Sequence, residues 1–229
     1  MMSRQAWGVV FVGVVVSLAG SQAAAQDDAP FGAADQLAFS AERLFGLEHA
    51  TQTVSITGGT ATTTSSGVSV FSNPLASLTT YATPRVAVDR LVTKGVSLGA
   101  ALGFFTISRS GTISAQETGV TVGPRAGYAL TLGQRASLWP RLGLAYGYVR
   151  SSGAGIGGLT NSRTQWAMVV DAPLVITLAP HFFVSVAPTV DVGFGGKVRT
   201  TSNMPNGPSG SQDVNETDFA FQCALGGYL

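Results

Sequence analysis

Hydrophobic residues alternate with small or polar residues along much of this chain. The clearest run is residues 96–104, in which Val, Leu, Ala, Leu and Phe alternate with Ser, Gly, Ala and Gly. A period of two residues is that of a β-strand, because successive side chains of a strand point to opposite faces. The same period recurs at residues 138–148, 166–176, 182–194 and 218–225, with weaker copies at 80–92, at 121–130 and from Leu37 onward. The pattern predicts an all-β protein with eight strands.

The connections between these runs alternate between short and long. Short turns are expected at residues 92–95, 132–135 and 178–181. Long polar loops are expected at residues 51–77, 108–120, 150–163 and 196–217. Eleven of the nineteen residues from 51 to 69 are Ser or Thr. Three short turns and four long loops are typical of a closed antiparallel barrel in an outer membrane, with periplasmic turns and external loops. Both ends of the barrel are then expected in the periplasm.

The apolar face of the strands is predicted to contact lipid. In a soluble barrel the apolar face lines the interior and the outer face carries charge, whereas the second face here is mostly Gly, Ala and Ser. Such small side chains suit the interior of an eight-stranded barrel, which its own side chains fill. Aromatic girdles are expected at both rims of the lipid-facing band. Their members are Trp166, Tyr146, Tyr148, Phe194 and Phe219 at the external rim and Phe182 at the periplasmic rim.

The composition agrees with a surface that largely faces lipid. Only 11% of the 229 residues are charged, against about 25% in ordinary soluble domains. The 13 basic and 12 acidic residues nearly balance, so nucleic acid is not expected as a partner. Gly153, Gly155 and Gly158 have the spacing of a dinucleotide fingerprint but lie in an expected loop. Neither a cofactor nor a metal site is predicted.

Residues 1–25 are expected to be a cleaved signal peptide. Arg4 supplies the positive charge, residues 7–18 are apolar, and alanines 23–25 offer a cleavage site before Gln26. A membrane anchor is disfavoured, because the apolar residues 6–20 fall short of the roughly 20 residues that a spanning helix needs. Residues 26–229 are then a single barrel domain.

Three of the strands share a Pro-Arg pair, at residues 84–85, 124–125 and 140–141, and each arginine falls on the lumen face. Arg125 and Arg141 face one another across a hairpin, an arrangement that requires anions between them. We therefore predict a structural ion-pair layer that plugs the barrel; the alternatives are a selectivity filter and a catalytic acid pair. The expected members are Arg85, Arg125, Arg141, Asp171 and Asp191, with Glu42 and Asp89 in reserve.

Two features conflict with uniform alternation. Arg43 falls on the apolar face of the first strand, where a lipid-facing Arg at mid-membrane costs about 2–4 kcal/mol. Five prolines also lie inside expected strands, and each forfeits a ladder hydrogen bond. A β-bulge is a way to resolve both conflicts. The prolines are Pro84, Pro124, Pro140, Pro173 and Pro188.

Enzyme signatures are poor, and no catalytic residue is assigned. The Gly-x-Ser-x-Gly spacing at residues 95–99 begins an alternating strand and is followed by no helix, so it is not a nucleophile elbow, and no Cys/His pair is present. His49, beside Glu48 at the external end of the first strand, is the one place where a Ser/His/carboxylate hydrolase or acyltransferase of lipid is imaginable. No particular Ser is singled out to complete a triad, so a surface histidine at the membrane interface is the preferred interpretation.

The eight alternating strands, three tight turns, four long loops and signal peptide resemble the small outer-membrane barrels, such as the membrane domain of outer membrane protein A and OmpX. The resemblance covers residues 36–229 and is one of pattern. It implies a monomer embedded in outer-membrane lipid and folded by the barrel-assembly machinery. That machinery commonly reads a terminal aromatic residue, whereas this chain ends in Leu229 beside Tyr228. The implied assembly signal is Phe219, Phe221, Leu225, Tyr228 and Leu229.

The expected function is a structural or adhesive one, with the loops as the interaction surface and the lumen plugged. Eight strands leave no continuous aqueous channel. The alternatives are a narrow channel for small solutes, motivated by the lumen arginines, and a lipid-modifying enzyme at His49.

Overall fold

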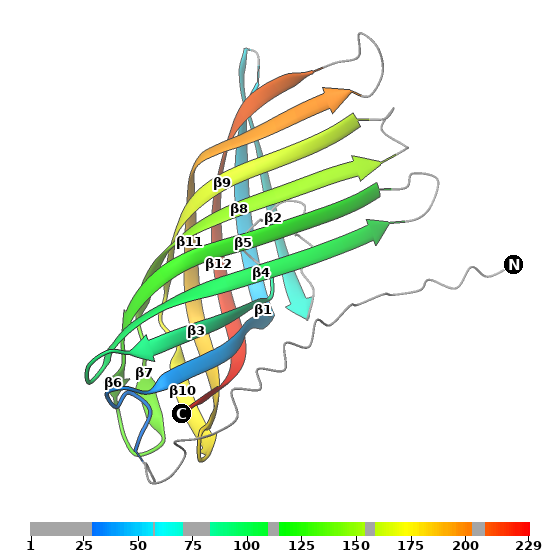
Figure 1. The fold of residues 1–229 in the computed structure, drawn as a ribbon. Helices are drawn as coiled ribbons and strands as arrows, with labels where there is room; N and C mark the ends of the chain where they lie inside the picture. Colours follow the sequence, from blue (N-terminus) through cyan, green and yellow to red (C-terminus); the bar gives the residue numbers. More distant parts are fainter. Residues whose placement is uncertain (1–28, 57, 71–82, 110–114, 154–158, 203–208) are drawn as a thin grey trace, which may run out of the picture.

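The computed structural model describes residues 29–56, 58–70, 83–109, 115–153, 159–202 and 209–229, and these residues form one antiparallel β-sheet (Figure 1). The expected signal peptide, residues 1–25, lies outside the described residues. Among the described residues, no helix is long and apolar enough to span a bilayer. The strands are β1 (Leu37–Ile56), β2 (Gly59–Val70), β3 (Arg85–Leu91), β4 (Val96–Arg109), β5 (Ala115–Tyr128), β6 (Leu130–Thr131), β7 (Ala136–Leu138), β8 (Arg141–Gly153), β9 (Leu159–Asp171), β10 (Leu174–Ala179), β11 (Phe182–Ser202) and β12 (Gly210–Tyr228).

Eight of these strands close into a barrel. The strands β12, β1, β3, β4, β5, β8, β9 and β11 pair in that order, and β11 also pairs with β12. The short strands β6, β7 and β10 extend β5, β8 and β9 beyond short interruptions, and they pair with one another and with β11. The structure therefore confirms the predicted closed antiparallel barrel of eight strands.

The short connections and both ends of the barrel lie at one rim, which we call the turn end; the opposite rim is the loop end. Tight turns join β3 to β4, β6 to β7 and β10 to β11, where the sequence predicts them. The turn after β3 uses Gly95 at φ 82° and the turn before β11 uses His181 at φ 64°. Ala38 pairs with Tyr228, which brings the start of β1 to the end of β12 (Figure 1).

The loop-end strands are longer than the sequence predicts. Much of the expected loop at residues 51–77 is a hairpin of β1 and β2, in which Thr51 pairs with Thr64 and Thr53 with Thr62. Parts of the other three expected loops are also strand, because β4 continues to Arg109, β8 to Gly153 and β11 to Ser202. Threonine favours strands. The polar composition of these segments therefore indicates exposure to water and does not indicate that strands are absent. Apart from Gly58 and Ser209, the remaining residues of the expected loops lie outside the described residues.

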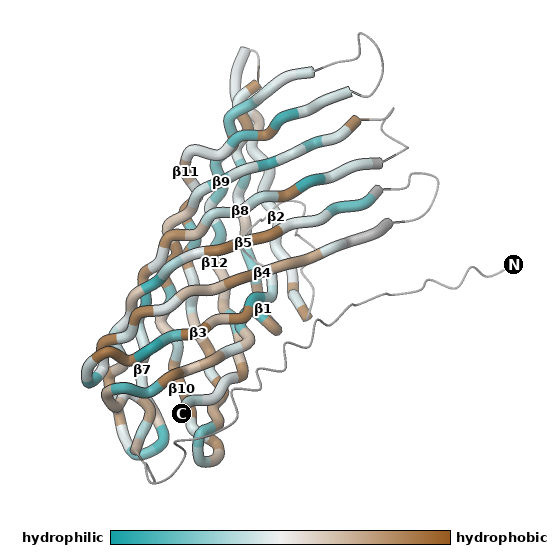
Figure 2. Tube along the Cα trace, viewed as in Figure 1, coloured by the Kyte–Doolittle hydropathy of each residue, from teal (hydrophilic) through white to brown (hydrophobic). Residues whose placement is uncertain are grey.

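The outer wall carries a continuous apolar band. One ladder row crosses five strands through Leu102, Val122, Tyr146, Trp166 and Phe194. Four of these side chains are 46–51% exposed, as expected of residues that face lipid. Figure 2 shows hydrophobic residues along the turn-end and middle parts of the strands and more hydrophilic residues toward the loop end.

Several of the conflicting prolines lie where no ladder bond is due. Pairing between β5 and β8 stops at Val122 and resumes at Arg125, so Pro124 faces no partner on β8. A Cβ on Gly123 in the same gap would overlap the Leu144 carbonyl oxygen, so the backbones approach closely there. Pro140 and Pro173 fall in the interruptions before β8 and before β10, and Pro84 precedes β3. Pro188 lies within β11, where it pairs in register with Phe221.

Candidate functional site

Three arginines and three carboxylates meet in the lumen near the turn end. We call Arg85, Arg125, Arg141, Glu42, Asp89 and Asp171 the central ion layer. The strand alternation directs all six side chains inward, and each is at most 10% exposed. Three positive and three negative charges balance within the layer.

Glu42 is the centre of this layer. Its Oε2 accepts hydrogen bonds from Arg85 Nε and Arg125 Nη1, both at 2.8 Å. Its Oε1 accepts one from Arg141 Nη1 at 2.7 Å. One carboxylate from the first strand therefore joins arginines from three other strands, β3, β5 and β8.

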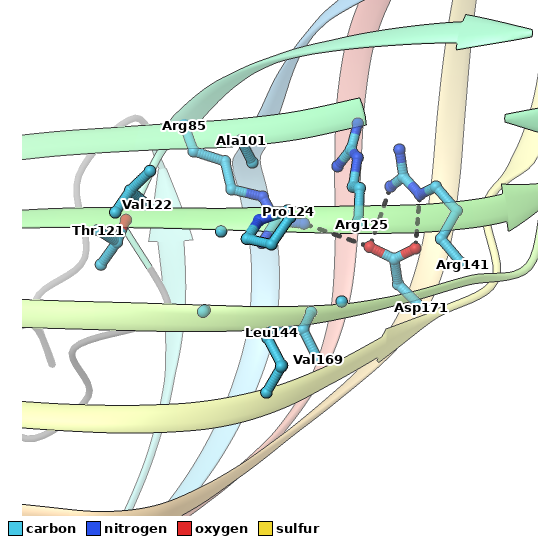
Figure 3. Close-up of a pocket in the computed structure, with 13 residues that line it drawn as sticks. Arg85, Ala101, Thr121, Val122, Pro124, Arg125, Arg141, Leu144, Val169 and Asp171 are labelled. Carbon is cyan, nitrogen blue, oxygen red and sulfur yellow. Dashed lines mark hydrogen bonds and ion pairs between the residues drawn. The ribbon is translucent and has the colours of Figure 1, made fainter. Parts of the chain in front are cut away.

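The other two carboxylates each bind particular arginines. Asp171 accepts from Arg141 Nε at 2.6 Å and Nη2 at 3.0 Å, and from Arg85 Nη2 at 3.3 Å (Figure 3). Asp89 accepts from Arg125 through Nε at 2.9 Å and through Nη2. Such two-pronged contacts fix the planar guanidinium group as well as its charge. A cavity of about 30 Å³ beside Arg85, Arg125 and Arg141 has room for about two waters.

The structure brings together six of the seven residues that the sequence proposed for this layer. Asp191, one of the two preferred partners, is not among them. Glu42 and Asp89, which the sequence analysis held in reserve, are both members of the layer. Asp191 instead binds Arg43, whose Nη1 and Nη2 lie 2.7 and 2.9 Å from its carboxylate oxygens.

Arg43 does not face lipid. The pairing of β1 with β12 shifts between Ala41 and Phe45, and Arg43 has φ 59°. This bulge adds residues to one strand without turning the rest of it over. It leaves Phe45 and Leu47 outside and buries the Arg43 side chain in the lumen. A left-handed non-glycine residue costs about 1–3 kcal/mol, and the paired contact with Asp191 offsets that cost.

A second charged group, which includes Arg43, lies on the loop side of the central ion layer. We call Arg43, Asp191, Asp218 and Glu48 the acidic group. Asp218 pairs with Asp191 directly across β11 and β12, is 1% exposed, and has no hydrogen-bond partner at either carboxylate oxygen. Glu48 accepts one hydrogen bond, from Ser69 at 2.9 Å. Three carboxylates therefore share one arginine.

Further charged and polar side chains fill the lumen beyond the acidic group. Arg163 forms an ion pair with Glu216 and donates a hydrogen bond to Gln165. All three side chains are buried. Polar side chains thus occupy the lumen at three successive levels above the turn end.

An apolar plug closes the turn end. Phe31, from the segment before β1, is 2% exposed and packs against Trp139, Phe183 and Tyr228 at ring-centroid distances of 4.9, 5.4 and 5.6 Å. The Arg141 guanidinium lies 4.6 Å from the Trp139 ring, so the plug contacts the central ion layer directly. We call Phe31, Trp139, Phe183 and Tyr228 the turn-end plug. The sequence reasoning missed Phe31, because a lone aromatic residue before the first strand has no periodicity.

The proposed assembly signal is divided between two faces. Phe219, Phe221, Leu225 and Leu229 are exposed on the outer wall, whereas Tyr228 points inward and belongs to the turn-end plug. Tyr228 is therefore a packing residue in this structure, and Leu229 is the outward residue at the end of the chain.

The structure separates His49 from Glu48. His49 is exposed on the outer wall, while the neighbouring Glu48 is buried in the lumen. His49 Nδ1 lies 2.7 Å from Ser66 Oγ, its partner across the β1–β2 hairpin. The described residues contain no group of three His, Cys, Asp or Glu side chains that fits a metal ion.

Comparison with known proteins rests on the fold. Neither a family model nor a curated protein matches this chain. Outer membrane protein AlkL, solved in lipid bilayers, superimposes with a TM-score of 0.52 and 12% identity over 92% of this chain and 97% of its own. OprG from Pseudomonas aeruginosa has a TM-score of 0.51 and 9% identity over 87% and 98%. Neisserial surface protein A has a TM-score of 0.44 and 10% identity over 82% and 96%.

These identities show a shared fold and nothing finer. The predicted resemblance to small outer-membrane barrels is confirmed at that level. The closed ring of strands and the exposed apolar band agree with it. The protein is an eight-stranded β-barrel with the fold of outer-membrane barrels.

Proposed function

We propose that this protein is a closed barrel whose role depends on its loop-end surface and not on passage through its lumen. The observation that carries the proposal is the succession of buried side chains along the lumen: the turn-end plug, the central ion layer and the acidic group follow one another, and their side chains are buried. The charged side chains of the central ion layer are buried and mutually paired, so moving them requires breaking several charge-assisted contacts at once.

The loop end supplies the surface for recognition. There the outer face changes from apolar to hydroxyl side chains, as in the β1–β2 hairpin, where Leu47 and Val68 give way to Thr51 and Thr64. Paired strands hold these side chains in fixed rows, which suits an adhesive or structural surface. The outward residues Phe219, Phe221, Leu225 and Leu229 remain the proposed assembly signal, and we propose a monomer.

Two measurements test this proposal together. Proteoliposomes that contain the protein should swell in an isotonic solution of a small sugar no faster than empty liposomes. Cells that display a variant with residues 53–62 replaced by a two-residue turn should sediment and adhere to plastic differently from cells that display the intact barrel. Sugar-driven swelling together with unchanged sedimentation and adhesion would contradict the proposal.

The hydrogen bond between His49 and Ser66 favours a second candidate, a hydrolase of lipid esters at the membrane interface. In such a reaction Ser66 Oγ attacks the ester carbonyl, His49 takes the hydroxyl proton and returns it to the leaving alcohol, and water then releases the acid from the serine. The pair lies beside Phe219, at the edge of the apolar band. However, the neighbouring Glu48 points into the lumen, so it does not orient the imidazole.

Fatty-acid release from phospholipid in mixed micelles tests this candidate. Ser66→Ala and His49→Ala should each abolish the release, while Thr64→Ala, one pair farther along the same face, should leave it intact. If the wild-type protein releases no more fatty acid than Ser66→Ala, the lipid-ester hydrolase is excluded.

A further inference from the structure

The exposed cations of the barrel fall into two sets. Among the side chains that the structure describes, those outside the lumen are Arg90, Lys94 and Arg135 at the turn end and Arg150, Lys197 and Arg199 at the loop end. We call the second set the rim cations. Arg90 has a partner in Asp35 at 3.2 Å, whereas none of the rim cations forms an ion pair with a described residue.

The rim cations lie together on neighbouring strands. Ser162 of β9 pairs with Arg150 of β8 on one side and with Arg199 of β11 on the other. The two arginines are therefore two strand spacings, about 10 Å, apart at the backbone. Lys197 lies two residues before Arg199 on the same face, about 7 Å along the strand. Three long cationic side chains thus surround one small serine.

The position of the rim cations relative to the apolar band is fixed by the register. Tyr146, Trp166 and Phe194 form one row of the band. The next row toward the loop end contains Tyr148, Thr164 and Lys197. The row after that contains Arg150, Ser162 and Arg199. A bulge between Phe194 and Lys197 keeps β11 in phase, so that Lys197 stays on the outer face. Lys197 therefore shares a row with Tyr148, and Arg150 and Arg199 lie one row beyond that last aromatic residue, where we expect the lipid head groups.

The other side of the barrel differs at the same level. Continuing the row of Arg150 away from Ser162 leads to Thr118 and then to Thr106. Of the residues that the structure describes, Asp213 is the one exposed acidic residue near the rim cations; it lies opposite Lys197 in the register of β11 and β12, and no ion pair joins the two. Among the side chains that the structure describes, exposed positive charge at the loop-end rim is thus confined to β8 and β11.

We propose that the rim cations bind the phosphate groups of a phosphorylated lipid in the outer leaflet, with its acyl chains against Tyr146, Trp166 and Phe194. Arginine guanidinium groups bind phosphate oxygens through paired hydrogen bonds. The band below supplies an apolar surface for the chains, which a soluble anion would not use. This site lies on the outer wall and does not depend on whether the lumen conducts.

Binding of diphosphoryl lipid A to the folded barrel in a neutral detergent tests the site. Each cation near an anionic head group contributes about fivefold to affinity, so Arg150→Gln with Arg199→Gln should weaken binding roughly 25-fold. Lys197→Gln alone should weaken it about fivefold. The matched control, Lys94→Gln with Arg135→Gln, removes two exposed cations from the turn end and should change affinity less than twofold. A mobility shift on heating shows that each variant is folded.

The choice of probes separates a lipid site from a general anion site. Dephosphorylated lipid A should bind weakly to the wild type. Its affinity should match that of diphosphoryl lipid A for the variant that combines Arg150→Gln and Arg199→Gln. Inorganic pyrophosphate at the same concentration should not compete, because it lacks the acyl chains. Equal losses in the loop-end and turn-end variants would show that net charge alone drives binding. Either that result or full competition by pyrophosphate would overturn the proposal.

Discussion

The central ion layer and the acidic group are adjacent in the lumen but carry different balances of charge. In the central ion layer, three arginines meet three carboxylates, and Glu42 alone binds all three arginines. In the acidic group, Arg43 is the single cation among three carboxylates, and Asp218 has no hydrogen-bond partner. A buried charge is tolerated when it is paired and is costly when it is not. The difference indicates that the central ion layer stabilises the closed barrel, whereas the acidic group carries more negative charge than closure requires.

The largest effect is expected from Glu42→Gln, which breaks the balance of the central ion layer. The substitution leaves three buried arginines with two carboxylates, so we expect a loss of about 3–5 kcal/mol in the free energy of unfolding. Urea unfolding in detergent micelles, followed by tryptophan fluorescence, measures it. Glu48→Gln makes the same chemical change in the acidic group and should cost less than about 1 kcal/mol. Equal losses would remove the distinction between the two groups.

A smaller loss is expected from Phe31→Ala, which opens the turn-end plug. Phe31 is almost completely buried against three aromatic rings, and removing it leaves a cavity among Trp139, Phe183 and Tyr228. We expect unfolding to become easier by about 3 kcal/mol. Leu132→Ala, in an exposed turn at the same rim, is the control and should cost less than about 1 kcal/mol. Similar values for the two variants would mean that Phe31 does not hold the plug together.

The smallest effect, and one of opposite sign, is expected from Asp218→Asn. This change removes a carboxylate that has no partner and that lies opposite Asp191. We therefore expect stability at neutral pH to stay constant or to rise by up to about 1 kcal/mol. Asp89→Asn is the matched change in the central ion layer and should be strongly destabilising, because Arg125 loses its two-pronged partner. A large loss from Asp218→Asn would show that the acidic group is also needed for closure.

The fold followed from the sequence because strand alternation and turn length are local signals. The sequence shows an outward apolar side chain at every second position, as in residues 96–104, and three tight turns. These two local features predict a closed barrel before any contact between strands is known. The same phase placed Arg85, Arg125 and Arg141 in the lumen. What phase does not determine is which carboxylate each arginine reaches, since that depends on the stagger between strands that are distant in sequence. The sequence therefore does not show that Glu42 is the residue at the centre of the layer.

Three other features required the structure because each departs from local regularity. The bulge at Arg43 interrupts the alternation at that residue, whereas the sequence pattern predicts an unbroken alternation there. Phe31 belongs to a segment without a period. The hairpin of β1 and β2 is made of polar residues, and polarity alone does not separate an exposed strand from a loop.

Electrical recording across a planar lipid bilayer tests most directly whether the lumen is closed. We predict that the purified wild-type barrel, inserted from detergent into the bilayer, gives no stepwise current in 1 M KCl. Steady, reproducible current steps from the wild type, with a conductance that changes when Arg125 and Arg141 are replaced by Ala, would contradict it.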